Sequence, residues 1–168
     1  MTETCAHELG ALEPQLVTLA DRHAAVVRGH QVPMSHIRGF YDSGYAALAQ
    51  VLAEQGVRPQ GPALAHHLRP PTETVDTELG FVTDRPVTAT TVHGVDVFAA
   101  TLRGGEAAQL THVGGYDTLG RSWERLEAWM AEQNGVPGER LLEEYLTEPA
   151  PDVDPATMRT RLSWFLAG

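Results

Sequence analysis

The residues best suited to chemistry lie in two strand-like segments, RLLEEYL and VDTELGFV. Glu143 and Tyr145 stand two residues apart in the first, and Glu78 lies in the second. Side chains two residues apart in a strand share a face, so Glu143 and Tyr145 should project together, away from Leu142. If Leu142 packs against a helix, Glu143 and Tyr145 face the open side of a sheet, and alternation places Glu78 there as well. Such carboxylates in an apolar concave site could bind a cation, with cation–π attraction of roughly 0.5–2 kcal/mol per aromatic ring.

Further residues could line the same pocket. His67 holds the position in GPALAHHL that corresponds to Tyr145 in ERLLEEYL, among the small residues Ala63 and Ala65. The aromatic residues that could line the ends of the pocket are Tyr41, Phe81 and Trp164. The alternation in RLSWFL does not fix the face that Trp164 occupies.

Other interpretations of these residues stay open. Glu143 could be a solvated strand residue, because one face of an antiparallel sheet is often wet. An enzyme could instead use Glu143 and Glu78 as general acid and base, with Tyr145 donating a hydrogen bond to the leaving oxygen. The sequence has no Ser-His-Asp order, G-x-S-x-G elbow, phosphate-binding loop or dinucleotide fingerprint. We therefore predict no cofactor and no established enzyme class.

The eight histidines do not predict a metal site. His66 and His67 are adjacent on a predicted strand and should point to opposite faces, and the others are scattered. His36 and His112 stand at equivalent places before the two predicted helices, where we expect them to stabilise a turn.

The candidate residues are carried by elements that apolar spacing predicts. Helical spacing runs through Tyr41, Tyr45, Leu48 and Leu52, and through the stripe Tyr116, Leu119, Trp123, Leu126 and Met130. We expect Tyr45, Trp123 and Trp129 to be core residues, and Gly56 and Gly135 to provide left-handed caps at the helix ends. Strand patterns occupy residues 24–30, 63–68, 75–82, 95–102, 141–147 and 160–166.

Four sequence blocks recur in order at offsets of 75–78 residues, beginning with AAVVRG from Ala24 and AATLRG from Ala99. A period this long indicates a duplicated half-domain. We predict one α+β domain over residues 1–168 with tandem βαββ repeats at about 15–90 and 91–168. The repeats should form a curved antiparallel sheet, with two helices on one face and a ligand groove on the other.

Charge and cysteine content indicate the cellular location of the protein and the partners it should not bind. Twelve Lys plus Arg against 22 Asp plus Glu give a formal charge of −10, which repels nucleic acid. The single Cys5 cannot form an intramolecular disulfide, and no apolar run has the length of a signal peptide core or membrane span. We expect a cytoplasmic bacterial protein that contacts neither nucleic acid nor membrane directly.

The second half resembles the GyrI-like small-molecule-binding family. The likeness to its Gly-Pro-Tyr, W-x-x-L-x-x-W and W-E-x-Y-L-x-D-P patterns runs through Gly114, Gly115, Tyr116, Trp123, Leu126, Trp129, Leu142, Glu143, Tyr145, Leu146, Glu148 and Pro149. The pattern D-x-E-x-G agrees at Asp76, Glu78 and Gly80. The sequence departs from the family where Gly115 replaces Pro, Leu142 replaces Trp and Glu148 replaces Asp.

The resemblance implies a duplicated βαββ fold with a central groove, in which the residue matching Glu143 meets cationic ligands. The family includes gyrase-inhibitory proteins and the effector-binding domains of AraC- and MerR-type regulators. Because this chain leaves no room for a helix-turn-helix domain, we expect a stand-alone binder of a drug- or toxin-like molecule, acting in sequestration, sensing or antibiotic resistance. One alternative is a hydrolase of a reactive toxin, and another is an acidic module that binds a protein partner such as gyrase or a regulator.

Overall fold

The computed structural model describes residues 12–148 and 150–167, so Cys5 and Pro149 lie outside the described residues. These residues contain nine strands and two α-helices, and the paired strands within each compact unit are antiparallel. The expected α+β class is therefore confirmed. One unit is Ala20–Gly104, and the other joins the segment ending at Leu19 to the chain from Gly105 onward.

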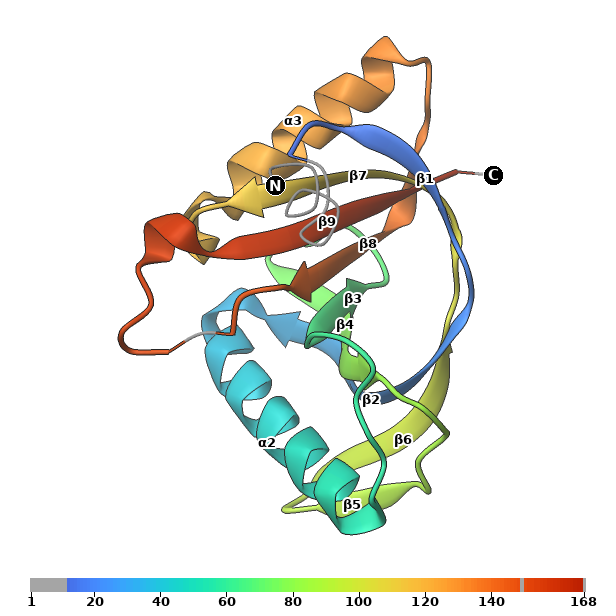
Figure 1. The fold of residues 1–168 in the computed structure, drawn as a ribbon, viewed down its shortest axis with the longest axis vertical. Coiled ribbons are helices and arrows are strands. Elements are labelled where there is room, and N and C mark those ends of the chain that lie inside the picture. Colours follow the sequence, from blue (N-terminus) through green and yellow to red (C-terminus); the bar gives the residue numbers. More distant parts are fainter. Residues whose placement is uncertain (1–11, 149, 168) are drawn as a thin grey trace, which may run out of the picture. The chain divides into compact units, whose positions relative to one another are not determined.

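The unit Ala20–Gly104 places one helix on a five-stranded sheet with strand order β3-β4-β2-β6-β5 (Figure 1). Its elements are β2 (Arg22–Pro33), the 3-10 helix η1 (Met34–His36), α2 (Ile37–Gln55), β3 (Leu64–His67), β4 (Thr74–Val82), β5 (Thr90–Val92) and β6 (Val95–Leu102). The buried residues of α2 recur at helical spacing: Gly44, Ala47, Leu48, Val51 and Leu52. A Cβ on Gly44 would lie 2.8 Å from Leu79 Cδ1, so α2 packs closely against β4.

The other unit has one helix and four strands in the order β1-β7-β9-β8. Its elements are β1 (Gln15–Leu19), β7 (Gly105–Val113), η2 (Tyr116–Thr118), α3 (Leu119–Glu132), β8 (Pro137–Tyr145), η3 (Pro155–Thr157) and β9 (Arg159–Leu166). Its core contains Ala108, Leu110, Leu126, Met130, Leu141, Leu162 and Trp164. Residues from α3 and from three strands thus form one buried cluster.

Each unit contains the order β-α-β-β, and in each the last strand pairs with both of the others. The correspondence between the first sequence blocks is nevertheless wrong. AATLRG lies in β6, which pairs directly with β2 through Ala24 and Ala100, and the strand that precedes α3 is β7. The short link between β6 and β7 contains Arg103 and Gly104, and no helix follows β6 directly.

The two helices end differently. Gly56 has φ 63° and caps α2 in the left-handed conformation, as expected. After α3 the left-handed residue is Asn134, with φ 58°, so the cap predicted at Gly135 is displaced by one residue. Asn tolerates this conformation better than most residues because its side chain is short and polar.

The face assigned to Glu143 from the sequence is reversed. Leu141 packs with Leu126 and Met130 of α3, so alternation along β8 turns Leu141, Glu143 and Tyr145 toward α3. Leu142 is fully buried on the opposite face. Because β8 carries a buried leucine on each face, its sequence gives the period of the strand but not which side the helix covers.

Candidate functional site

Among the described residues, uncharged donors from a strand and from a helix form hydrogen bonds with Glu143. The Tyr145 hydroxyl donates a hydrogen bond to Glu143 Oε1 at 2.8 Å. The indole N–H of Trp123, on α3, donates to Oε2 at 3.2 Å. Glu143 is only 9% exposed, so this carboxylate is largely removed from water. Both hydrogen bonds fix its orientation on the α3 side of the strands.

Four aromatic side chains surround this carboxylate in two edge-to-face pairs. The rings of Tyr116 and Tyr145 are 5.6 Å apart, and those of Trp123 and Trp164 are 5.8 Å apart. The Trp164 indole donates to the Gly138 carbonyl at 2.9 Å. Trp164 pairs directly with Leu141 in the sheet and its ring contacts Trp123 of α3, so it lies on the same side of the strands as Glu143, which decides the face that the sequence left open. We call Glu143, Tyr145, Trp123, Trp164 and Tyr116 the Glu143 cluster.

Tyr116 forms the exposed part of the Glu143 cluster. It is 41% exposed, whereas Trp164 is 7% exposed. Partial burial raises the pKa of the Tyr116 phenol, and the negative charge of Glu143 raises this pKa further. Both effects disfavour a second negative charge at this position. The phenol consequently stays neutral around pH 7, and its hydroxyl can donate a hydrogen bond.

In the unit Ala20–Gly104, Tyr41 and Phe81 belong to a second group of aromatic rings on the α2 side of the strands. Tyr45 contacts both of them edge-to-face, with ring centroids 6.0 Å apart in each pair. His67 also faces α2, because its partner in β4 is Thr77, which alternates with Leu79 and Phe81. Its Nδ1 lies 3.0 Å from Thr77 Oγ1, and the residue is buried.

Glu78 occupies the face of β4 turned away from α2. Arg28 donates from Nε to Glu78 Oε2 at 3.1 Å, and His66 Nδ1 lies 3.2 Å from Oε1. Burial acts to raise the pKa of Glu78, but hydrogen bonds and charge from His66 and Arg28 outweigh it and hold the pKa below its usual value. Glu143 faces the helix of its own unit and Glu78 does not. The expectation that Glu143 and Glu78 share one open face is therefore wrong.

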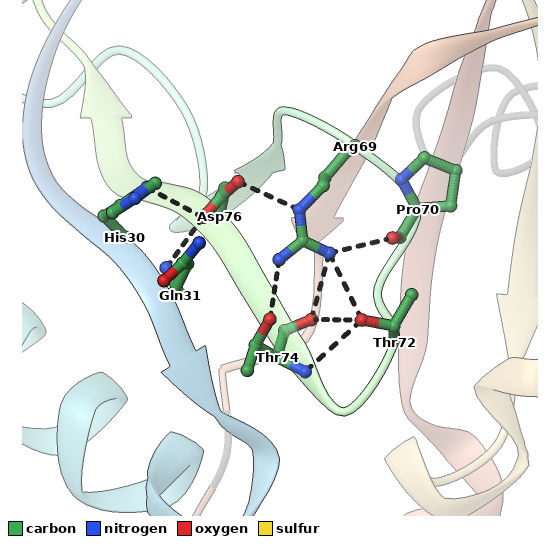
Figure 2. A network of polar contacts seen from close by, with 7 residues as sticks. All are labelled: His30, Gln31, Arg69, Pro70, Thr72, Thr74 and Asp76. Atoms are coloured by element: carbon green, nitrogen blue, oxygen red, sulfur yellow. Dashed lines mark hydrogen bonds and ion pairs between the residues drawn. The ribbon is translucent and has the colours of Figure 1, made fainter.

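The family pattern at Asp76 has a structural role in this protein. Asp76 accepts from the Gln31 backbone N–H at 2.7 Å and from Arg69 Nε at 2.9 Å, and His30 Nδ1 lies 3.1 Å from it (Figure 2). Gln31 has φ 48° at an irregularity where the β2–β4 register shifts between Gly29 and Val32. Asp76 thus binds a backbone N–H that this bulge removes from the strand ladder.

Among the described residues, no group of three or more His, Cys, Asp or Glu side chains is placed to hold a metal ion. His66 and His67 point to opposite faces, as expected from their adjacency. His112 lies near the end of β7 and is buried, and its Nε2 contacts the Gly115 carbonyl and Thr118 Oγ1, so its expected role in the turn before α3 is confirmed. Within the described parts of the chain, no helix is both long and apolar enough to cross a membrane.

The family model for the GyrI-like small molecule binding domain matches residues 12–165. The chain belongs to this family. A search of curated protein sequences found no significant match.

Solved structures of similar fold share little sequence with this GyrI-like protein. The EcmrR C-terminal domain is 15% identical with a TM-score of 0.73, and the match covers 92% of this chain and 97% of that one. A hydrolase from Listeria innocua is 16% identical with a TM-score of 0.66, covering 99% and 98%. SAV2435 bound to tetraphenylphosphonium is 16% identical with a TM-score of 0.63, covering 93% and 94%. At these identities the likeness concerns the fold.

Two members of the Glu143 cluster were not selected from the sequence as site residues. Their spacing predicts that Trp123 and Tyr116 belong to an apolar helix stripe. Trp123 does pack against the core, yet its indole N–H is directed at Glu143. The family's W-x-x-L-x-x-W pattern was the available signal, since an indole brings a hydrogen-bond donor into a core position.

Proposed function

We propose that this GyrI-like domain binds lipophilic organic cations, of the kind found among drugs and toxins, at the Glu143 cluster. The observation that carries the proposal is the carboxylate of Glu143, which is 9% exposed and surrounded by aromatic rings. An ionised carboxylate in a poorly hydrated site interacts more strongly with a cation than a carboxylate in water does. Aromatic faces add cation–π attraction and apolar contact area.

Two of the hydrogen bonds of Glu143 support a binding role over a purely structural one. Trp123 and Tyr145 are neutral donors, so they orient the carboxylate without cancelling its charge. That charge acts on Tyr116, whose pKa it raises after the larger effect of burial. A cation that reaches Tyr116, the exposed member of the cluster, would therefore meet both an aromatic ring and a negative potential. Sequestration or sensing of such a molecule follows from binding alone.

Calorimetric titration with tetraphenylphosphonium tests the proposal, and the fold similarity to SAV2435 in complex with this cation supports the choice of probe. We expect Glu143→Gln to weaken binding at least tenfold, which corresponds to about 1.4 kcal/mol. The matched control is Glu139→Gln, which removes an equal charge from an exposed position on the same strand. An equal loss in both variants would show that only the overall charge of the protein matters.

The hydrolase alternative is decided on the same complex. General acid or base catalysis by Glu143 with Tyr145 as hydrogen-bond donor would consume a reactive ligand, whereas a binding protein returns it unchanged. We expect mass spectrometry to recover intact ligand after prolonged incubation with the protein. A product that forms with wild type but not with Glu143→Gln would replace the binding proposal with an enzymatic one.

A further inference from the structure

A serine and a buried histidine form a close pair outside the Glu143 cluster. His112 lies in β7 and is 5% exposed, and its Nδ1 is 2.6 Å from Ser122 Oγ in α3. The other ring nitrogen, Nε2, is 3.0 Å from the Gly115 carbonyl and 3.1 Å from Thr118 Oγ1. These two residues are ten positions apart and come from different elements, which is why no sequence motif indicated the pair.

The hydrogen bonds determine which nitrogen carries the proton. A carbonyl oxygen can only accept, so His112 Nε2 must donate to Gly115. The Thr118 hydroxyl also donates to that carbonyl, at 3.0 Å, which leaves its oxygen available to accept from Nε2. In the neutral imidazole, Nδ1 is then the unprotonated nitrogen and accepts the Ser122 hydroxyl proton. This is the arrangement in which a histidine activates a serine.

The serine can be reached from outside. Ser122 and His112 both line an open cavity of about 470 Å³. Thr118, Arg121, Arg125 and Glu13 line the same cavity. Arg125 is ion-paired with Glu13. Arg121 is exposed and makes no ion pair with any residue that the structure describes. Within the described parts of the chain, no carboxylate pairs with this guanidinium, which lines the same cavity as Ser122 and favours a negatively charged molecule there.

We propose that Ser122 is a nucleophile, with His112 as its general base, that accepts the acyl group of small esters carrying a carboxylate on the acyl chain. The Ser122 oxygen attacks the ester carbonyl carbon as its proton moves to His112 Nδ1. The carbonyl carbon–alkoxide bond breaks, and the proton on Nδ1 passes to the departing oxygen. Water, deprotonated by His112, then attacks the acyl-serine, releases the acid and restores the Ser122 hydroxyl. The Arg121 guanidinium attracts the carboxylate of the acyl chain.

Labelling of the full chain with a fluorophosphonate probe, followed by peptide mass spectrometry, tests the nucleophile. We expect Ser122 to form a phosphonyl ester with loss of fluoride, about 100-fold or more faster than an unactivated serine. Ser43, which is exposed on α2, is the internal reference, and Ser43→Ala should leave labelling of Ser122 unchanged. His112→Gln should reduce labelling of Ser122 to the rate of Ser43. Equal labelling of the two serines in native wild type would overturn the proposal.

Wild type alone decides the question if His112→Gln does not fold. Labelling of Ser122 should fall to the reference rate in urea, because activation requires the folded pair, and an unchanged rate in urea would also overturn the proposal. The role of Arg121 is tested by hydrolysis of p-nitrophenyl acetate and mono-p-nitrophenyl glutarate. We expect wild type to prefer the charged ester and Arg121→Gln to lose that preference. Equal rates for both esters with wild type would refute selection of an anionic acyl group.

Discussion

Gly80 offers a sharp test of how closely β4 packs against β2. A Cβ at this position would lie 2.3 Å from the Ala25 carbonyl oxygen and 3.1 Å from Val26 Cγ1. The first of these contacts is with backbone of the adjacent strand, where Gly80 pairs with Val26. Relief of the clash therefore requires a shift of the strands themselves. Only glycine, which has no Cβ, fits at this position without such a shift. Close packing thus explains the glycine at the last position of the D-x-E-x-G pattern.

Replacement of Gly80 by alanine should destabilise the protein, and Gly39 provides the opposite case. Overpacking typically costs about 1–3 kcal/mol. A Cβ on Gly39, in the first turn of α2, would meet no atom within 4 Å. There Gly→Ala should increase the free energy of unfolding by about 0.4–1 kcal/mol, because the unfolded chain loses conformational freedom. The two variants should thus differ by about 1.5–4 kcal/mol.

Urea denaturation followed by circular dichroism measures this difference, and both sites lie in the unit Ala20–Gly104. For a chain of this size each kcal/mol corresponds to about 2–4 °C in Tm. Gly80→Ala should melt below wild type and Gly39→Ala at or above it. A Gly80→Ala variant as stable as Gly39→Ala would refute the close approach of β2 and β4 inferred from the contact distances.

Two further predictions concern charge. Glu143→Gln should lower the raised pKa of Tyr116 toward 10.0, because the carboxylate charge is the second cause of that shift after burial; a tyrosinate absorbance titration checks this, and an unchanged pKa would contradict the contact. The pKa of Asp76 is held below 3.8, first by the Gln31 N–H and then by Arg69 and His30 against the opposing effect of burial. Its stabilising contribution is therefore present above pH 3.8 and lost as the pH falls through the lower folded-state pKa. Asp76→Asn should lower the free energy of unfolding at neutral pH, and should lower it less in strong acid. A loss of free energy that does not depend on pH would show that ionisation of Asp76 is irrelevant.

The sequence predicted most of the elements because their signals are local. The stripe through Leu48 and Leu52 predicted α2, and alternation predicted β4 and β9 within a few residues. The strand β7 was missed because GEAAQLTHV mixes small, polar and apolar residues without alternation, although six of its nine residues are buried. Its burial depends on pairing with β1 and β9, which lie far away in the sequence.

The sequence predicted only part of the candidate site, because contacts between distant segments leave no local signal. Alternation grouped Glu143 with Tyr145 correctly, and their hydrogen bond confirms that they share a face. Which face they share depends on where α3 packs. Leu141 and Leu142 are equally suited to pack against a helix, so the sequence does not decide it. The pairing of Trp123 with Glu143 is a contact between a helix and a strand, so no spacing along either element could reveal it.

The charge of Glu143 should select a cationic ligand at this cluster. The most direct measurement compares tetraphenylphosphonium with neutral triphenylphosphine oxide by calorimetry, on wild type and on Glu143→Gln. We predict that the substitution weakens binding of the cation at least tenfold, or about 1.4 kcal/mol, and leaves binding of the neutral compound nearly unchanged. An equal loss for both compounds would show that Glu143 only shapes the site, and no loss for either would place the ligand elsewhere.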